Sequence, residues 1–447
     1  MTTSDPAFDA ALEALRSRWE HVMVPGTARM HELMDLLGSP QRAYPAVHLT
    51  GTNGKTSTAR MVDALLRAHG LRTGRYTSPH LEHITERISL DGEPISEARF
   101  GEVWQDIAPY VGMVDARHPE RVTFFELTTA MAFASFADAP VDVAVVEVGL
   151  GGEWDATNVI DAGVCVVTTV DLDHTALLGT TVEAIATEKA GIVHEGATLI
   201  TALQPPTALD VLLRRAGDVG ANVAREGLEF GVLARDLAVG GQQLALQGLG
   251  GTYDGIFLPL HGGHQAHNAA AALAAVEAFL GAGDKHALDL DTVREGFALV
   301  DSPGRLEVVR RSPTVLLDGA HNPAGAAALV AALHEEFAFQ HLVVVLGCLA
   351  DKDVHGILEH LEPVAAEIVC TSSSSPRAMD AEDLEALARE VFDEDDVHLE
   401  VRLPDALDAA FALTDRAAAD RGFDGGAGIL VCGSLVTVGE ARTLLRR

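Results

Sequence analysis

One short glycine-rich segment has the residue types that bind phosphate, namely GTNGKTS at residues 51–57. Its two glycines allow a tight turn whose backbone N–H groups can surround phosphate oxygens, and Lys55 adds a cation. Either Thr56 or Ser57 could offer a hydroxyl to Mg²⁺. The segment lacks the first glycine of the full G-x-x-x-x-G-K-[ST] pattern, because Leu49 stands there. The apolar strand before it and the helix after it favour a nucleotide loop over an ordinary turn with a surface lysine.

Polar side chains also follow several apolar runs that we expect to be strands. They are Ser78 and His80 in YTSPHL, Glu147 in VVEVGLGG, Asp173 and His174 in VDLDHT, and Asp318 and His321 in LLDGAHNP. Ligands of open α/β sheets bind beyond the carboxyl ends of the strands, so these side chains predict a site there. Such a set would suit Mg²⁺, which needs few protein ligands. Each residue alone could equally be a turn residue or a helix cap, and only their repeated placement favours a shared site.

Lysine is rare in this chain, which makes each one informative. Of the 32 basic residues only four are Lys, so 32 − 4 = 28 are Arg. Arginine cannot replace an amine that must lose its proton, so a lysine in an arginine-rich chain indicates a special requirement. Lys189, late in TTVEAIATEKAGI, is such a position. Its ordinary interpretation would be a surface cation that stabilises the end of a helix.

Composition limits the classes of function. The chain has 447 residues, 48% of them hydrophobic, and a formal net charge of −33. This content excludes a disordered chain, and the acidic balance argues against nucleic acid or a membrane as partner. The four cysteines lie far apart, so we expect reduced core residues. Without a signal-peptide pattern or a long apolar stretch, we expect a soluble cytoplasmic protein, and without heptads, a monomer.

The pattern of elements predicts an α/β fold. We expect helices at 7–20 and 27–37, buried strands at 46–50, 141–149 and 162–170, and a small β-rich excursion over 222–262. After a linker at 297–309, strands and helices alternate again, with five strands. We therefore predict two domains. Residues 1–300 would form a P-loop ATPase-type domain carrying the excursion, and residues 301–447 a smaller Rossmann-like α/β domain.

Taken together, these segments resemble the folylpolyglutamate synthase / dihydrofolate synthase family, which belongs to the Mur-type ATP-dependent ligases. The similar strings are GTNGKTS, TSPHL with ERI (86–88), TFFELTTAMAF (123–133), EVGLGG with DATN (147–158), DLDHTALLG (171–179), EKAGI (188–192), HQAHNAAAA (264–272), PGRLEV (303–308), LDGAHNPAG (317–325), ADKD (350–353), SPRAM (375–379) and CGSL (432–435). They run in family order along most of the chain.

The resemblance implies a reaction and a set of substrates. The family transfers the γ-phosphoryl group of ATP to a folate or pteroate carboxylate, and the amine of L-glutamate then attacks the acyl phosphate to give an amide. Phosphoryl transfer needs positioning and charge neutralisation by metal, Lys and Arg. ATP would be a co-substrate and Mg²⁺ the cofactor, with two ions expected. Whether the acceptor is dihydropteroate, a reduced folate or both stays open.

The resemblance also implies roles for individual residues. The ATP-binding positions would be Gly51, Thr52, Asn53, Gly54, Lys55, Thr56, Ser57, Asn268, Arg305 and Asp318. The metal ligands would be Thr56 or Ser57, Ser78, Glu147, His174 and a carbamylated Lys189. The pterin-side pocket would comprise Thr123, Phe124, Phe125, Glu126, Trp154, Asp155 and Ala156, with His80 as a further substrate contact. Lys55, Lys189, His174 and His321 would be catalytic.

Two departures from the family pattern bear on these roles. The family usually has G-K-G-S in the loop, whereas this chain has Gly54-Lys55-Thr56-Ser57, so either hydroxyl could serve the metal. The family also usually has Arg-Leu before DATN, whereas this chain has Glu153-Trp154. The family's arginine is therefore missing here, and the substrate contacts at this point do not carry over from the family pattern.

Two alternatives belong to other classes of function. A murein-peptide ligase would carry a UDP-binding domain before the phosphate loop, but only 50 residues precede Gly51, fewer than a typical domain needs. A non-catalytic nucleotide switch would use the loop alone and would leave Glu147, His174 and Lys189 unexplained as a set. We therefore favour the glutamate ligase.

Overall fold

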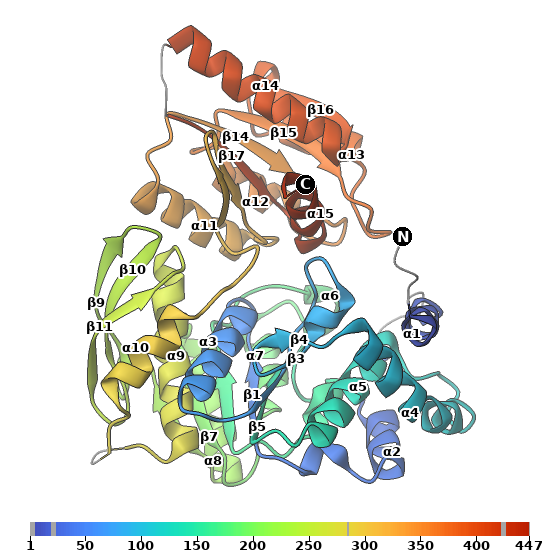
Figure 1. Ribbon diagram of the computed structural model, residues 1–447. Coiled ribbons are helices and arrows are strands. Elements are labelled where there is room, and N and C mark those ends of the chain that lie inside the picture. Colours follow the sequence, from blue (N-terminus) through green and yellow to red (C-terminus); the bar gives the residue numbers. More distant parts are fainter. Residues whose placement is uncertain (1–4, 19–23, 284–285, 422–425, 447) are drawn as a thin grey trace. The chain divides into compact units, whose positions relative to one another are not determined.

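The computed structural model describes residues 5–18, 24–283, 286–421 and 426–446 (Figure 1). The chain divides into two compact units, which are described separately. The larger unit comprises residues 1–235, 243–258 and 267–300, and the smaller comprises 236–242, 259–266 and 301–447. Both contain a mainly parallel sheet with helices, so the predicted α/β class is confirmed.

The larger unit is built on an eight-stranded sheet in the order β4-β3-β2-β5-β1-β6-β7-β8. Its strands are β1 (Ala46–Thr50), β2 (Thr73–Tyr76), β3 (Ile88–Leu90), β4 (Glu93–Pro94), β5 (Val143–Glu147), β6 (Val164–Val167), β7 (Thr198–Thr201) and β8 (Asn222–Arg225). Strands β5, β1 and β6 run parallel at the centre, and every residue in them is buried. Burial on both faces explains why these strands are continuous apolar runs rather than alternating ones.

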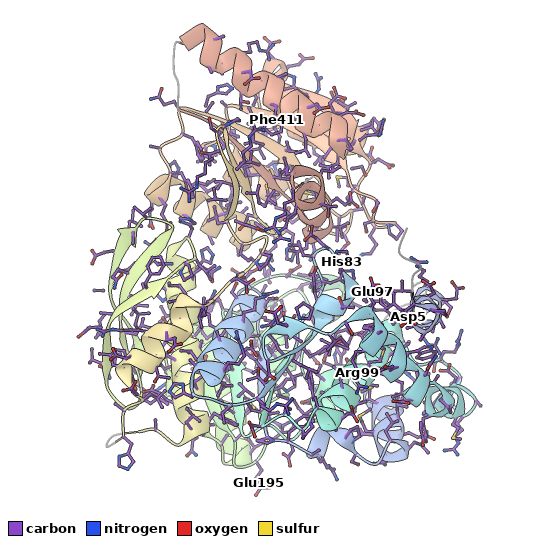
Figure 2. The ribbon with its side chains drawn as sticks, viewed as in Figure 1. Asp5, His83, Glu97, Arg99, Glu195 and Phe411 are labelled. Carbon is purple, nitrogen blue, oxygen red and sulfur yellow. The ribbon has the colours of Figure 1, made fainter. Side chains whose placement is uncertain are left out.

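The helices of the larger unit precede, connect and follow these strands. They are α1 (Pro6–Arg16), α2 (Ala28–Leu36), α3 (Lys55–Ala68), α4 (Glu97–Asp115), α5 (Phe124–Asp138), α6 (Thr175–Leu178), α7 (Val182–Ala190), α8 (Pro206–Val219), α9 (Gly263–Leu280) and α10 (Leu290–Ala298), with short 3-10 helices η1 (Pro40–Arg42), η2 (Ile84–Arg87) and η3 (Ala156–Val159). The first helix ends earlier than expected, and residues 19–20 of the predicted 7–20 helix lie outside the described part. Asp5, labelled in Figure 2, caps α1 by accepting the N–H of Ala7.

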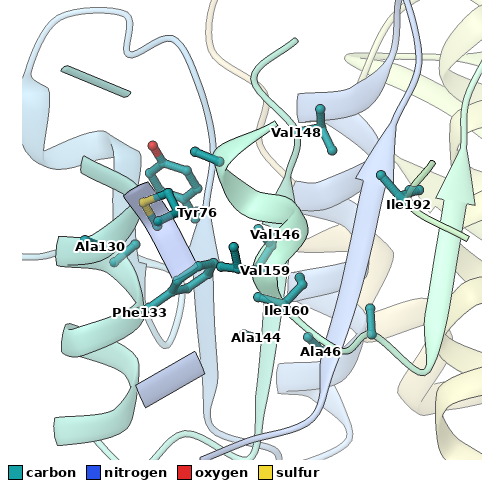
Figure 3. Packing of buried hydrophobic residues seen from close by; sticks show 14 of the residues in the cluster. Ala46, Tyr76, Ala130, Phe133, Ala144, Val146, Val148, Val159, Ile160 and Ile192 are labelled. Carbon is teal, nitrogen blue, oxygen red and sulfur yellow. The ribbon is translucent and has the colours of Figure 1, made fainter. Parts of the chain in front are cut away.

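The main core of this unit lies where α5 packs against the sheet. Figure 3 shows Phe133 of α5 close to Tyr76 of β2 and Val146 of β5, all fully buried. Close approach requires glycine at position 74, where a Cβ atom would stand 2.4 Å from Cδ1 of Phe136. The packing of α5 therefore fixes the positions of the strand ends that carry the predicted site.

A second, three-stranded sheet forms within the expected β-rich excursion. Its order is β11 (Thr252–Leu258), β10 (Gly241–Gln247), β9 (Gly231–Ala238), and α10 packs against β11 (Figure 1). Strand β8, at the start of the predicted 222–262 excursion, instead pairs in parallel with β7 in the large sheet. The buried carboxylate of Glu277 on α9 accepts bonds from Tyr253 Oη and the Leu249 and Gly250 N–H groups, which anchors the small sheet to α9.

The smaller unit contains a six-stranded sheet in the order β12-β13-β17-β14-β15-β16. Its strands are β12 (Glu307–Arg311), β13 (Thr314–Leu317), β14 (His341–Leu346), β15 (Glu367–Ser372), β16 (Val397–Arg402) and β17 (Ala427–Cys432), and its helices are α11 (Pro323–Glu336), α12 (Val354–Leu361), α13 (Ala381–Ala388), α14 (Leu403–Arg421) and α15 (Leu435–Leu445), with 3-10 helix η4 (Glu394–Asp396). Helix α14 lies along β14 to β17 (Figure 1).

The structure corrects two expectations, the linker at 297–309 and the count of five strands, because of one additional strand. Residues 307–311 form β12, which pairs antiparallel with β13 and adds a sixth strand. The charged sequence EVVRR hides this edge strand, because three of its five residues are charged and its exposed positions are Val308, Arg310 and Arg311. All four cysteines are free and buried, as predicted. Within the described part of the chain, every helix is too short or too polar to span a bilayer.

A buried ion pair ties α3, the helix after the phosphate loop, to β2. The fully buried carboxylate of Asp63 accepts bonds from Thr73 Oγ1 at 2.5 Å and from Arg75 Nη1 at 2.8 Å. Arg75 is itself only 4% exposed, so neither charge can be hydrated if the other is removed.

Replacing Asp63 by alanine should therefore lower the free energy of unfolding by about 3–5 kcal/mol, because the Arg75 guanidinium would stay buried without its partner. Asp138, whose side chain is 70% exposed in its pair with Arg99, is the matched control and should cost less than about 1 kcal/mol as alanine. Urea unfolding of both variants measures the difference. Equal losses in the two variants would contradict the assigned role of Asp63.

Candidate functional site

The phosphate loop links the end of β1 to the start of α3. Gly51 (φ +151°) and Gly54 (φ +87°) both adopt backbone conformations that favour glycine. Side chains also crowd them, since a Cβ atom at 51 would stand 1.8 Å from Thr168 Oγ1 and one at 54 would stand 2.5 Å from Asn268 Oδ1. Thr168 Oγ1 also donates to the carbonyl of Asn53. The loop is therefore held in a single shape, and Asn268 lies beside Gly54.

Two lysines converge on one carbonyl of this loop. Lys55 Nζ donates to the carbonyl oxygens of Gly51 at 2.9 Å and Thr52 at 3.1 Å, and Lys189 Nζ donates to the Gly51 oxygen at 2.8 Å. Lys189 is 3% exposed, and burial followed by repulsion from Lys55 lowers its pKa to about 7. A large share of this amine is therefore uncharged near neutral pH, the state that reaction with CO₂ requires.

A buried carboxylate lies at the carboxyl end of β5. Glu147 is 1% exposed and accepts from Thr56 Oγ1, at 2.8 Å and 3.0 Å from its two oxygens, and from the Ser78 N–H at 3.2 Å. The carboxylate thus joins the phosphate loop, the segment after β2 and the end of β5. Ser57 is buried on the first turn of α3, and of the two hydroxyls that the sequence left open, Thr56 is the one bonded to Glu147.

His174 and Asp173 follow the loop after β6. His174 adopts a left-handed backbone conformation (φ +50°) at the start of α6, and its N–H donates to Asp173 Oδ1. The charge of Asp173 raises the pKa of Lys189 and so opposes the effect of burial. The Asp173 carboxylate therefore interacts electrostatically with the Lys189 amine. Among the described residues, no group of three or more His, Cys, Asp and Glu side chains could by itself hold a metal ion.

The segment that carries Ser78 also carries His80. Arg87 Nε donates to His80 Nδ1 at 3.0 Å, and burial followed by the charge of Arg87 lowers the pKa of His80 to about 3. The Arg87 guanidinium lies over the Phe124 ring, 5.1 Å from its centroid. His80 and Phe124, both predicted substrate contacts, are therefore linked by Arg87. The sequence analysis assigned no role to Arg87, although it lies in the ERI string.

The aromatic residues at the start of α5 flank the same region. Thr123 caps the helix, and Glu126 completes a capping box by accepting the Thr123 N–H at 2.7 Å. Both oxygens of Glu126 also face Arg29 Nε at 3.1 Å, so this buried carboxylate is engaged within the fold. The ring centroids of Phe125 and Tyr76 lie 5.8 Å apart. Phe125 also covers Gly149, where a Cβ atom would stand 2.4 Å from Cζ of Phe125.

The DATN segment places Asp155 in the interior. Its side chain accepts bonds from the Leu150 N–H, the Thr157 N–H and Thr157 Oγ1, and it is 3% exposed. These donors engage the carboxylate within the fold, so Asp155 shapes the loop after β5 and caps η3. The neighbouring Trp154 is half-buried, and its backbone N–H donates to Glu188 Oε1 at 3.2 Å. Ala156 starts η3.

The smaller unit brings three predicted residues together after β13. Asp318 accepts the N–H groups of Leu306 and Ala320, each at 2.8 Å. His321 Nδ1 lies 2.8 Å from the carbonyl oxygen of Gly319, and a Cβ atom at Gly319 would meet Arg305 Nη1 at 2.2 Å. Arg305, Asp318 and His321 therefore form one cluster at the carboxyl end of this strand.

Comparison with known proteins identifies similar sequences and structures. The model of the Mur ligase middle domain matches residues 49–276, and that of the Mur ligase, glutamate ligase domain matches residues 304–435. The chain is 53% identical to the dihydrofolate synthase/folylpolyglutamate synthase of Mycobacterium tuberculosis, over 97% of this chain and 93% of that protein. It is 35% identical to the Escherichia coli protein of the same name, over 94% and 91%.

Solved structures give the same result. The M. tuberculosis folylpolyglutamate synthase complexed with ADP superimposes with a TM-score of 0.95 at 53% identity, covering 99% of this chain and 98% of that one. The E. coli FolC in complex with DHPP and ADP superimposes with a TM-score of 0.86 at 30% identity, covering 100% and 99%.

The lowered pKa of Lys189 gives a pH-dependent prediction. Because this amine has a pKa of about 7 when folded and 10.5 when exposed, the unfolded chain binds more protons between these values, and stability should rise with pH across that window. Replacing Lys189 by methionine should remove this rise. Urea unfolding at pH 6.5, 8 and 9.5 in CO₂-free buffer compares the two proteins. A difference between them that does not change with pH would contradict the burial of an ionisable amine.

Proposed function

Since this chain belongs to the Mur ligase family and is an ATP-dependent ligase that joins glutamate to folate, we propose that its catalytic centre is built around Gly51. The observation that carries this proposal is the convergence of Lys55 and Lys189 on the Gly51 carbonyl, beside the Thr56–Glu147 pair. Loop N–H groups and the Lys55 cation suit the phosphates of ATP, and a buried carboxylate suits a metal bound to them.

We propose that the ATP phosphates lie against Gly51, Thr52, Asn53, Gly54, Lys55, Thr56 and Ser57. Asn268 lies beside this loop, which supports its role as a nucleotide contact. In the smaller unit the cluster of Arg305, Asp318 and His321 would supply the other contacts to ATP, with His321 facing a phosphate. We also propose the working division of the chain into an ATP-binding domain at 1–300 and a C-terminal Mur-ligase-like domain at 301–447.

The residues at the end of β5 fit Mg²⁺. Glu147 offers carboxylate oxygens, and Thr56 brings a hydroxyl to the same point, whereas phosphates and water can supply the remaining ligands of this small ion. We propose that Glu147, Thr56 and Ser78 hold one ion and that His174 and carbamylated Lys189 hold a second, with Ser57 supporting the loop. Bound Mg²⁺ would neutralise charge on the transferring phosphoryl group.

The reaction we propose has two steps. A carboxylate oxygen of the pterin substrate bonds to the γ-phosphorus as the bond to the bridging oxygen breaks, which gives an acyl phosphate and ADP. The uncharged amine of L-glutamate then attacks the acyl carbon and forms the C–N bond. Phosphate leaves with the C–O bonding electrons and takes up the proton that the nitrogen loses. Lys55 is placed to stabilise the developing negative charge, and the loop N–H groups hold the phosphates in line.

The acceptor pocket would lie between the segment after β2 and the start of α5. Phe124, Phe125 and Trp154 provide apolar and aromatic surface, and His80 provides a polar edge. Since the oxygens of Glu126 and Asp155 are engaged within the fold, we propose that these residues, with Thr123 and Ala156, act by shaping the pocket. Dihydropteroate and reduced folates share the pterin group, so we propose that both bind here.

We propose that the protein works as a cytoplasmic monomer on small-molecule substrates, independently of nucleic acid and membranes. The relatives from M. tuberculosis and E. coli carry both activities in their names, which supports a bifunctional enzyme. Its products would be dihydrofolate and folates with additional glutamates.

Phosphate release from Mg-ATP and L-glutamate tests the proposed function. We expect release with dihydropteroate and with tetrahydrofolate, and none without an acceptor, because phosphate leaves only after acyl transfer. A Lys55→Met variant should lose at least about 100-fold in rate and controls for contaminating ATPases. Release with only one acceptor would restrict the enzyme to that activity. Release with a UDP-murein precursor instead, or with no acceptor, would contradict the assignment.

A further inference from the structure

The segment between Ser78 and His83 is held in shape by the two residues Glu86 and Arg87 of η2. Glu86 accepts the N–H groups of Leu81 at 2.8 Å, Glu82 at 3.1 Å and His83 at 2.8 Å. His83, labelled in Figure 2, is the N-cap of η2. A single carboxylate thus satisfies three successive backbone donors, so the position of His80 just before them is fixed.

Arg87 holds the side chain of His80 as Glu86 holds the backbone. Its Nε–H donates to His80 Nδ1 at 3.0 Å, while the same guanidinium lies over the Phe124 ring. Arg87 is only 7% exposed, so packing restricts its geometry. One side chain therefore fixes two proposed pocket residues from different elements, His80 on the loop after β2 and Phe124 on α5.

The direction of this hydrogen bond determines where the imidazole proton lies. A guanidinium N–H can only donate, so Nδ1 of His80 must carry a lone pair. An imidazole with a lone pair on Nδ1 is neutral and has its proton on Nε2. Within residues 5–18, 24–283, 286–421 and 426–446, no hydrogen bond to His80 Nε2 is formed, so this N–H is available as a donor.

We propose that Arg87 is a positioning residue of the acceptor pocket, which fixes His80 as the Nε2–H tautomer and so presents one hydrogen-bond donor to an acceptor atom of the pterin substrate. The identity of the ligand in this proposal rests on the proposed function. The tautomer of His80 does not depend on that function. Arg87 contributes through His80 and Phe124 and need not touch the substrate. Its loss should weaken binding of the pterin substrate and leave binding of ATP unchanged.

The tautomer is tested first, by long-range ¹H–¹⁵N correlation NMR of the full-length protein labelled with ¹⁵N-histidine. A His80→Gln variant assigns the His80 signals by difference. We expect the wild-type protein to show a protonated Nε2 and an unprotonated Nδ1, and an Arg87→Met variant to show both tautomers in exchange. A wild-type His80 with its proton on Nδ1, or an Arg87→Met spectrum identical to the wild type, would overturn the proposal.

Kinetics then test the consequence for the substrate. Arg87→Met should raise KM for dihydropteroate about tenfold, the effect of losing one hydrogen bond, while KM for ATP stays constant. Arg310→Met is the matched control, because Arg310 lies 4.9 Å from the Phe411 ring centroid in the smaller unit and makes the same kind of contact away from the pocket. Phe411 is labelled in Figure 2. An equal change in both arginine variants, or a parallel rise in KM for ATP, would overturn the proposal.

Two further His80 variants keep the test decisive if Arg87→Met does not fold. Glutamine can place an amide N–H near the position of Nε2, so His80→Gln should retain much of the affinity for dihydropteroate, whereas His80→Leu should lose about tenfold. Equal affinities in these two variants would contradict a donor role. If the wild-type enzyme used neither pterin acceptor, the proposed function would fail, and the NMR spectra would still decide the tautomer.

Discussion

The arrangement of the site depends on one buried carboxylate, that of Glu147. It lies at the end of a central parallel strand, where backbone packing leaves almost no access to water, and it binds the Thr56 hydroxyl and the Ser78 N–H. A buried charge is costly unless neighbouring groups compensate it, so the loops after β1 and β2 must come together at this point. The same requirement makes the end of β5 a natural place for a cation.

The contacts of the phosphate loop follow from the same constraint, the burial of charged groups. Lys55 and Lys189 share the Gly51 carbonyl, and burial followed by the charge of Lys55 lowers the pKa of Lys189. Glycine is required at position 51, because Thr168 fills the space that a side chain would occupy. The loop geometry that we propose for phosphate and the lowered pKa of Lys189 thus arise from the same few contacts. We regard this shared origin as the reason that lysine persists at 189 in an arginine-rich chain.

Sequence reasoning predicted the elements whose patterns are local. The buried strand at 46–50, the phosphate loop and the alternation of strands and helices in the smaller unit all follow from apolar runs and turn residues. It missed β12, because EVVRR reads as a charged linker until its pairing with β13 is known. It did not anticipate that Asp155 accepts from its sequence neighbours Leu150 and Thr157, or that Glu126 contacts Arg29, which is 97 residues away in the chain. Arg87 was missed because no sequence pattern indicates that its side chain contacts His80, and only the three-dimensional structure shows this hydrogen bond.

The most direct test of the account is the Mg²⁺ dependence of phosphate release by a Glu147→Gln variant. Glutamine keeps an oxygen that can accept from Thr56 and Ser78, so the variant should fold with wild-type stability and still bind ATP. Because the amide lacks the negative charge that a metal requires, we predict that turnover falls about 100-fold or more and is not restored by excess Mg²⁺. Wild-type turnover with an unchanged Mg²⁺ dependence would contradict the central role of this carboxylate.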